Sequence, residues 1–144
     1  MKPIKALLLA AGYGTRLKPI TNKIPKCLVE VNKKPMLEHW FLKLEDLGIK
    51  EILINTHYLN EKVKNFLNQR PPSKLKVTNI YEPNLRGTAR TLIDNYKFFK
   101  NSTILFIHAD NFTKSDLKGL VNEFLNRPKN CLLTMLTFRT QEPS

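Results

Sequence analysis

The sequence predicts an α/β fold, a doubly wound and mostly parallel sheet with helices on both faces. Short apolar runs of strand length alternate with longer stretches in which apolar residues recur at helical spacing, which is the pattern of βαβ units. The chain has 144 residues, of which 42% are apolar, enough to bury a core. We therefore predict one domain over residues 1–144.

The first strand is expected at residues 4–9. No polar face follows Lys5, so this strand should be central, with helices on each side. An amphipathic helix is expected next, behind Pro35, a good first-turn residue, and it should end near Gly48. Its apolar stripe consists of Leu37, Trp40, Phe41, Leu44 and Leu47.

The remaining strands are predicted at residues 51–55, 75–81, 103–107 and 132–138. Between them we predict three helices: one marked by Val63, Phe66 and Leu67 that must stop before Pro71 and Pro72, one over residues 87–98, and one capped by Ser115 and running to Asn126. Five strands and four helices in alternation favour a doubly wound sheet. In such sheets the ligand lies outside the carboxyl ends of the strands.

Lysine and arginine exceed aspartate and glutamate by 24 to 12, and the net charge of +12 favours anionic partners. The basic residues are scattered, whereas a nucleic-acid-binding protein should show clustered charge with interleaved aromatics. No stretch approaches the roughly 20 apolar residues of a membrane span. We expect neither nucleic acid nor membrane as a partner. Cys27 and Cys131 lack metal-ligand spacing, which favours a reduced, cytoplasmic protein.

A loop of small residues follows the first strand. Its backbone N–H groups could cradle an anion, and Gly12 and Gly14 permit both a turn and a close approach. Two known motifs fail here, because the dinucleotide fingerprint needs a third glycine where Leu17 stands and the P-loop needs four residues between its glycines. The two glycines alone are also compatible with a tight turn.

Arg16 and Lys26 bracket the proline-marked segment that continues this loop. Arginine offers a forked, permanently charged donor set for phosphate oxygens, and lysine a compact charge. Each cation alone is compatible with a solvated surface position. Together with the glycines, they favour a triphosphate-binding loop.

These residues carry a resemblance to a known family. The run GYGTRLKPIT at residues 12–21, followed by PK at residues 25–26, resembles the signature of sugar-1-phosphate nucleotidylyltransferases, the enzymes that make nucleotide sugars. NKKPML at residues 32–37 and LGIKEI at residues 47–52 extend the resemblance, which covers nearly the whole chain.

The resemblance reaches a branch of the family. EPNL at residues 82–85, ahead of GTA at residues 87–89, looks more like the mannose-1-phosphate guanylyltransferase group than the thymidylyl group. The resemblance implies a Rossmann-like nucleotide-diphospho-sugar transferase fold and transfer of a nucleoside monophosphate from a nucleoside triphosphate to a sugar-1-phosphate, with release of pyrophosphate. GTP with a mannose- or heptose-type phosphate is our preference, and UTP with an amino sugar phosphate comes second.

The same resemblance assigns site residues. Arg16 would neutralise the leaving pyrophosphate and Lys26 the α-phosphate region, both as catalytic residues. The nucleotide would be bound by Leu9, Ala10, Ala11, Gly12, Gly14, Thr15, Glu82, Gly87 and Thr88. From the residues alone, Gly87 and Thr88 open a helix whose free N–H groups suit a polar ligand, although a glycine turn capped by threonine is equally open.

Asp110 is the candidate ligand for Mg²⁺. It follows the strand predicted at residues 103–107, and Mg²⁺ typically uses one or two carboxylates plus substrate phosphates. The resemblance places the first metal-binding aspartate here, while Asp110 alone could equally cap a turn. We interpret His108, like His39 and His57, as structural or as a support for residues that contact the ligand, because an ionised sugar phosphate needs no catalytic base.

Two features depart from the family. Arg90 stands where glycine is usual, and its side chain could crowd the substrate mouth or contact a phosphate. Family members continue past the position of Ser144 through more sheet, with a second metal-binding aspartate and a lysine for the sugar phosphate, so we expect the carboxyl-terminal part of the fold to be missing. The rival functions are a non-catalytic nucleotide-binding or regulatory module and a basic nucleic-acid-binding protein. A homo-oligomer is compatible with the sequence, which does not fix the oligomeric state.

Overall fold

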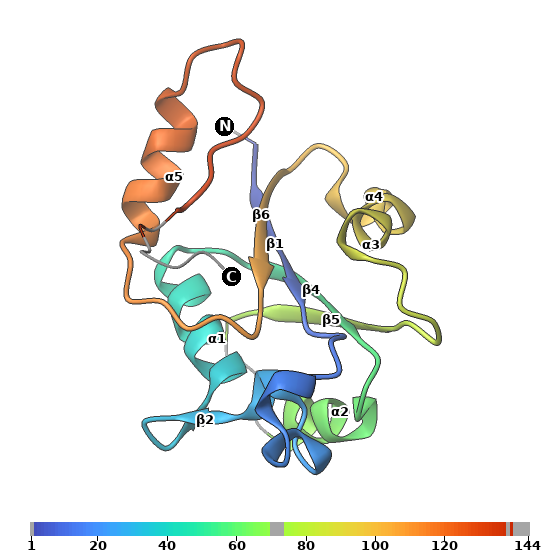
Figure 1. The fold of residues 1–144 in the computed structure, drawn as a ribbon. Helices are drawn as coiled ribbons and strands as arrows, with labels where there is room; N and C mark the ends of the chain where they lie inside the picture. Colours follow the sequence, from blue (N-terminus) through green and yellow to red (C-terminus); the bar gives the residue numbers. More distant parts are fainter. Residues whose placement is uncertain (1, 70–73, 138, 140–144) are drawn as a thin grey trace. The chain divides into compact units, whose positions relative to one another are not determined.

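A four-stranded parallel sheet organises the computed structural model, which describes residues 2–69, 74–137 and 139 (Figure 1). Its strands are β1 (Ile4–Leu9), β4 (Glu51–Thr56), β5 (Lys76–Tyr81) and β6 (Thr103–His108), in the order β5-β4-β1-β6. In register, Leu9 lies opposite Asn55 of β4 and His108 of β6. The order therefore reverses at β1, and the switch point between β1 and β6 is where ligands bind in such sheets.

Helices cover both faces of this sheet. Helix α1 (Met36–Asp46) lies on one face, and α3 (Thr88–Asp94) with α4 (Tyr96–Phe99) lies on the other (Figure 1). Leu7 and Leu9 share one face of β1, as alternation requires, and pack with Leu53 and Phe99 in a core cluster. The predicted α/β class with helices on both faces is confirmed.

The predicted central strand and first helix are confirmed in detail. Ala6, Leu7 and Leu8 are fully buried in β1, which has a hydrogen-bonded neighbour on each side. Helix α1 has Pro35 at its N-cap and is followed by Gly48 at a φ of 71°. A left-handed glycine at this position is a common way to end a helix. The helix after β4 is α2 (Asn60–Gln69), and the prolines predicted to stop it lie outside the described residues.

Between β1 and α1 the chain forms short elements that the sequence did not predict. Three single turns, η1 (Thr15–Leu17), η2 (Ile20–Asn22) and η3 (Lys26–Leu28), fold the loop that carries the motif. A small antiparallel hairpin follows, made of β2 (Glu30–Val31) and β3 (Lys34–Pro35). Its turn has positive φ at both central residues, which hairpins of two-residue loops favour.

Two helix predictions need correction. The helix predicted over residues 87–98 is two helices, α3 and α4, because Asn95 leaves the helical conformation at φ −109° and ψ 18°. Ile93 of α3 and Tyr96 of α4 are exposed. Helix α5 (Leu117–Asn126) is capped by Asp116, not by Ser115, because Asp116 Oδ1 accepts from the Gly119 N–H at 3.0 Å.

The prediction of a strand at residues 132–138 is wrong for residues 132–137, and residue 138 lies outside the described residues. The sequence there is apolar, but Leu132 is 88% exposed and Met135 69% exposed. Strand propensity acts through packing against neighbours, and residues 132–137 pair with none of the described strands.

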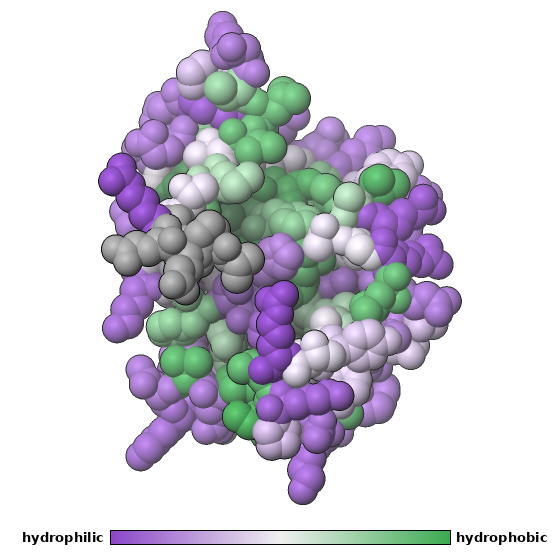
Figure 2. All heavy atoms as spheres, in the orientation of Figure 1, coloured by the Kyte–Doolittle hydropathy of each residue, from purple (hydrophilic) through white to green (hydrophobic). Residues whose placement is uncertain are grey.

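The described residues form two compact units, one up to Phe112 and one from Thr113 onward. The sheet, α1 to α4 and the cavity described below all belong to the first unit, and α5 belongs to the second. One domain over residues 1–144 stays a prediction. Hydrophilic side chains are spread widely over the face drawn in Figure 2, in line with the scattered basic residues. In the described ranges, no helix is both long and apolar enough to cross a membrane.

Candidate functional site

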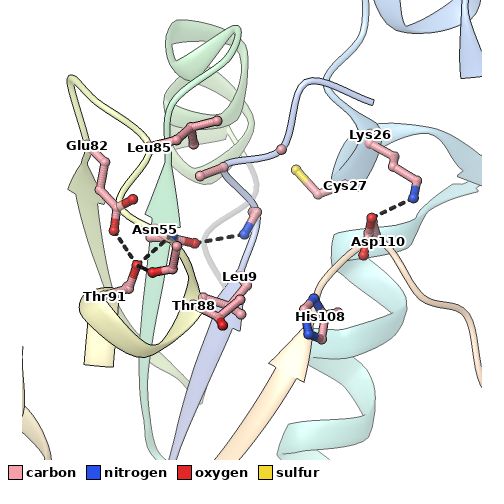
Figure 3. A pocket seen from close by; sticks show the side chains of 14 residues that line it. Leu9, Lys26, Cys27, Asn55, Glu82, Leu85, Thr88, Thr91, His108 and Asp110 are labelled. Carbon is pink, nitrogen blue, oxygen red and sulfur yellow. Dashed lines mark hydrogen bonds and ion pairs between the residues drawn. The ribbon is translucent and has the colours of Figure 1, made fainter. Parts of the chain in front are cut away.

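A cavity of about 230 Å³ lies at the carboxyl ends of all four strands of the sheet (Figure 3). Its lining consists of Leu9, Ala10, Ala11, Gly12, Lys26, Cys27, Asn55, Glu82, Leu85, Gly87, Thr88, Thr91, His108 and Asp110. The structure thus gathers nine of the predicted site residues, and three more, Gly14, Thr15 and Arg16, lie outside the lining. The cavity is where the doubly wound topology predicts a ligand.

The backbone after β1 has free donors at this cavity. Within the described part of the chain, the N–H groups of residues 11–14 make no hydrogen bond, whereas the Ala10 N–H is bonded to the Asn55 carbonyl and side chain. A Cβ built on Gly12 would meet no heavy atom within 4 Å. Successive N–H groups in a turn conformation can form a concavity that suits an anion.

Gly14 has a structural role in this loop. Its φ of 65° is left-handed, and a Cβ there would lie 2.8 Å from Thr21 Cγ2. The fully buried Thr21 donates from Oγ1 to the Gly14 carbonyl at 2.7 Å. The spacing between glycine and threonine in the motif therefore folds the loop back onto itself, and Gly14 shapes the cradle without lining the cavity.

Lys26 and Asp110 form an ion pair at one end of the cavity (Figure 3). Lys26 begins η3 and Asp110 follows β6, and Nζ lies 2.5 Å from Oδ2. Their side chains are 28% and 32% exposed. The predicted phosphate-binding cation and the predicted metal ligand thus neutralise each other.

Arg16 does not join them. It is exposed in η1, and it has no hydrogen bond or ion pair with any other residue that the structure describes. The structure therefore brings Lys26, but not Arg16, into the cavity, and contact of Arg16 with phosphate stays a prediction.

Cys27 lines the cavity beside Lys26. Burial, with a smaller contribution from the charge of Asp110, raises the pKa of its thiol to about 12. The thiolate is the nucleophilic form of cysteine. Cys27 is therefore a neutral apolar wall of the cavity, not a nucleophile.

At the other end of the cavity, a chain of buried polar groups joins three strand ends (Figure 3). The Ala10 N–H donates to Asn55 Oδ1 at 2.9 Å, Asn55 Nδ2 donates to Thr91 Oγ1 at 3.3 Å, and Thr91 Oγ1 donates to Glu82 Oε1 at 2.6 Å. Buried polar networks of this kind fix side-chain orientation when every member is satisfied. Glu82 is thereby held by its neighbours.

The sequence did not single out Asn55 or Thr91. Asn55 had a signal, since it is a polar residue near the carboxyl end of a strand that is otherwise apolar from Ile52 to Ile54. Thr91 had none, because its partners come from β4 and β5 and its place one turn into α3 looks ordinary.

Gly87 and Thr88 line the cavity at the start of α3. Gly87 has φ 80° and ψ 161°, a conformation that is essentially restricted to glycine. No side chain caps α3 there, so the alternative of a turn capped by Thr88 is wrong. The glycine is required by the backbone itself.

Two of the three histidines bond to backbone carbonyls. His57 Nδ1 lies 2.7 Å from the Glu82 carbonyl, so Nδ1 carries the proton and donates, and Nε2 lies 3.0 Å from the Tyr13 hydroxyl. His39 Nε2 lies 2.8 Å from the Val31 carbonyl. Their structural interpretation is confirmed, whereas His108 is exposed and lines the cavity.

Arg90 neither crowds the cavity nor lines it. Its Nε lies 2.8 Å from Asp94 Oδ1, one turn further along α3, and Arg86 pairs with the other oxygen of the same carboxylate at 2.8 Å. Asp94 thus holds both arginines at the surface.

Within the described ranges, no group of three or more histidine, cysteine, aspartate or glutamate side chains could hold a metal ion. Mg²⁺ does not require such a group, since it keeps water and often takes one carboxylate together with substrate phosphates. Asp110 fits that kind of site, because it lines the same cavity as Ala11 and Gly12, whose N–H groups make no hydrogen bond to the described residues.

The family is shown by comparison with known proteins. The family model described as nucleotidyl transferase matches residues 5–144. The chain belongs to the nucleotidyl transferase family. Over 90% of its length it is 36% identical to a D-glycero-alpha-D-manno-heptose 1-phosphate guanylyltransferase of Campylobacter jejuni, and the match covers 56% of that relative.

Two solved structures share the fold of this nucleotidyl transferase chain. A putative glucose-1-phosphate thymidylyltransferase from Bacillus anthracis matches with a TM-score of 0.77 at 31% identity, over 85% of this chain and 50% of that one. HddC from Yersinia pseudotuberculosis, complexed with GMP-PN, matches with a TM-score of 0.74 at 28% identity, over 88% of this chain and 55% of that one. The chain thus spans about half the length of the relatives it matches.

Proposed function

We propose that this chain binds a nucleoside triphosphate with Mg²⁺ and belongs to an enzyme that transfers the nucleotidyl group to a sugar-1-phosphate in nucleotide-sugar biosynthesis. The observation that carries the proposal is that Ala11 and Gly12, whose N–H groups make no hydrogen bond to the described residues, line the same cavity as Lys26 and Asp110. Phosphate oxygens would accept from these donors. We place the reaction in the cytoplasm.

Guanine is the base that the other end of the cavity suits best. Glu82 is 8% exposed, and Oε2 makes no hydrogen bond to the described residues yet is not fully enclosed. A carboxylate accepts only, and guanine presents two adjacent donors, N1–H and the N2 amino group. Uracil presents a single donor between two carbonyls, which a carboxylate repels. Leu9 and Leu85 offer apolar surface to the faces of a base.

In the proposed reaction, an oxygen of the sugar phosphate attacks the α-phosphorus in line and pyrophosphate leaves. Positioning and charge neutralisation would supply nearly all the acceleration. Lys26 would leave Asp110 for the α-phosphate, Arg16 would neutralise the pyrophosphate, and Asp110 would be freed to hold Mg²⁺. Bound Mg²⁺ supplies neutralisation of phosphate charge.

A second candidate is a nucleotide-binding or regulatory module without catalysis. None of the described residues that line the cavity is assigned here to a sugar phosphate, and the chain spans about half the length of its relatives. Both candidates require the same nucleotide site.

Calorimetric titration with GTP, UTP, CTP, dTTP and ATP in the presence of Mg²⁺ tests the nucleotide site. We expect GTP to bind most tightly, and Glu82→Ala to remove the preference. Pyrophosphate release with a panel of sugar-1-phosphates then separates enzyme from module. Absence of binding to every triphosphate would refute both candidates, and salt-sensitive binding to DNA in its place would support the basic nucleic-acid-binding rival.

A further inference from the structure

We propose that Thr91, oriented by Asn55, is a positioning residue that fixes the Glu82 carboxylate for reading the donor edge of guanine. The inference rests on the proposed function, because it concerns how that site distinguishes its nucleotide. It adds a residue that need not touch the base.

The buried hydrogen bonds that run from Ala10 to Glu82 have one favoured assignment of donors and acceptors. The Ala10 N–H can only donate, so the oxygen of the Asn55 amide must face it at 2.9 Å. The Asn55 amide nitrogen then faces Thr91 Oγ1 at 3.3 Å and donates to it. The Thr91 hydroxyl is left with its single proton, which has two possible acceptors, Glu82 Oε1 at 2.6 Å and the Gly87 carbonyl at 3.3 Å. The shorter bond, to the charged oxygen, is favoured.

Burial makes this direction decisive. Asn55, Thr91 and Glu82 are 4%, 1% and 8% exposed, so water has little access to replace a missing partner. The chain starts at the backbone that leaves β1 and ends on a carboxylate that follows β5. It therefore ties the loop with the free N–H groups to the carboxylate proposed to read the base.

The bond from Thr91 engages one carboxylate oxygen and leaves the other for a ligand. Rotation about the last bond of a glutamate side chain is broad and only weakly restricted by itself. A bond at 2.6 Å to one oxygen fixes this rotation, so that Oε2 keeps one direction towards the cavity. Without the hydroxyl, the carboxylate plane could turn and would fit the two guanine donors less well.

Inosine triphosphate is the probe for this geometry, because it keeps the N1–H donor of GTP and lacks the N2 amino group. A hydrogen bond to a charged group contributes about tenfold or more to affinity. We expect the unsubstituted protein to bind GTP at least about tenfold more tightly than ITP. In Thr91→Val, the ratio of GTP to ITP affinity should fall to within about threefold of unity. Thr91→Ser, which keeps the hydroxyl, should restore most of the ratio.

Thr56→Val is the matched control. Thr56 is a fully buried threonine at the end of β4, and its Oγ1 contacts Asn60 Oδ1 at 2.6 Å and Asn79 Oδ1 at 2.9 Å but not the Glu82 side chain. Its backbone carbonyl accepts from the Glu82 N–H at 2.8 Å, and the substitution leaves that carbonyl in place. Its loss should lower stability by a comparable amount and leave the ratio of GTP to ITP affinity unchanged. A lowered ratio in Thr56→Val would show that destabilisation alone relaxes the site, which would overturn the inference.

The outcomes separate the inference from the proposed function. If the unsubstituted protein prefers GTP and Thr91→Val keeps the full preference, the positioning role is wrong while the nucleotide site stands. If the unsubstituted protein binds GTP and ITP equally, or binds neither, the reading of guanine by Glu82 fails and the inference fails with it. If Thr91→Val does not fold, Asn55→Ala provides the test, because the Ala10 N–H keeps its bond to the Asn55 carbonyl at 3.2 Å. An unchanged ratio of GTP to ITP affinity in Asn55→Ala would overturn the proposed positioning of Glu82.

Discussion

Replacing Gly12, Gly14 or Gly48 by alanine adds one methyl group and tests the geometry of the loop after β1, with Gly48 as the reference outside that loop. Gly14 and Gly48 have nearly the same left-handed backbone, with φ of 65° and 71°. A Cβ would meet nothing within 4 Å at Gly48, whereas at Gly14 it would lie 2.8 Å from Thr21 Cγ2 and 3.3 Å from Lys26 Cβ. Gly12 has neither a left-handed φ nor any atom within 4 Å of its added Cβ.

The expected free energies follow from these differences. A non-glycine residue in the left-handed region costs about 1–2 kcal/mol, which is the expected destabilisation for Gly48→Ala. Gly14→Ala should add overpacking of about 1–3 kcal/mol, because its closest neighbour is a fully buried side chain held by a hydrogen bond. We expect about 2–5 kcal/mol in total for Gly14→Ala. Gly12→Ala should change stability by less than about 0.5 kcal/mol.

Urea unfolding followed by circular dichroism measures these differences, and calorimetry with GTP measures binding by the same variants. Gly12→Ala should keep its stability and lose affinity, because its methyl group would project into the space beside the free N–H groups. Equal destabilisation in Gly14→Ala and Gly48→Ala would refute the contact with Thr21. Unchanged GTP affinity in Gly12→Ala would refute the use of this loop as a phosphate cradle.

Three further predictions concern charged and titratable groups of the site. In Asp110→Asn, Mg²⁺ should no longer tighten GTP binding, and GTP should bind more tightly without Mg²⁺ because Lys26 loses its competing partner. Calorimetry with and without Mg²⁺ measures both effects, and a Mg²⁺ response equal to that of the unsubstituted protein would contradict the metal role of Asp110. If the unsubstituted protein releases pyrophosphate, Arg16→Ala should abolish that release. The free energy of unfolding should change by less than about 0.5 kcal/mol, since Arg16 is exposed and has no partner within the described residues. Full activity in the purified variant would exclude a catalytic role for Arg16. Because burial raises the pKa of Cys27 from 9.0 to about 12, the unfolded thiol ionises first and stability should fall as pH rises above 9; this fall should be smaller in Cys27→Ala, and an identical pH dependence would contradict the buried, neutral thiol.

The end of the cavity that we propose for phosphate could be located from the sequence because its residues are nearly continuous in the chain. The strand, the free backbone donors, Gly14 and Lys26 all lie between residues 4 and 26, and local rules for glycine and lysine are enough to interpret them. Asp110 was predictable because carboxyl ends of parallel strands meet at one edge of a sheet. Arg16 shows the limit, since its sequence position next to the glycines does not bring its side chain into the cavity.

The base end could not be predicted in the same way. The role proposed for Thr91 depends on Asn55 in β4 and on Glu82 after β5, and no spacing along the chain encodes a contact between three elements. The strand predicted at residues 132–138 failed for a related reason, because apolar strand-forming residues become a strand only beside a partner. Local sequence pattern is therefore enough to find side chains whose role depends on the backbone next to them. Side chains that act by orienting one another can be found only once the fold is known. The two ends of the cavity differ in this respect although one hydrogen bond, from the Ala10 N–H to Asn55, connects them.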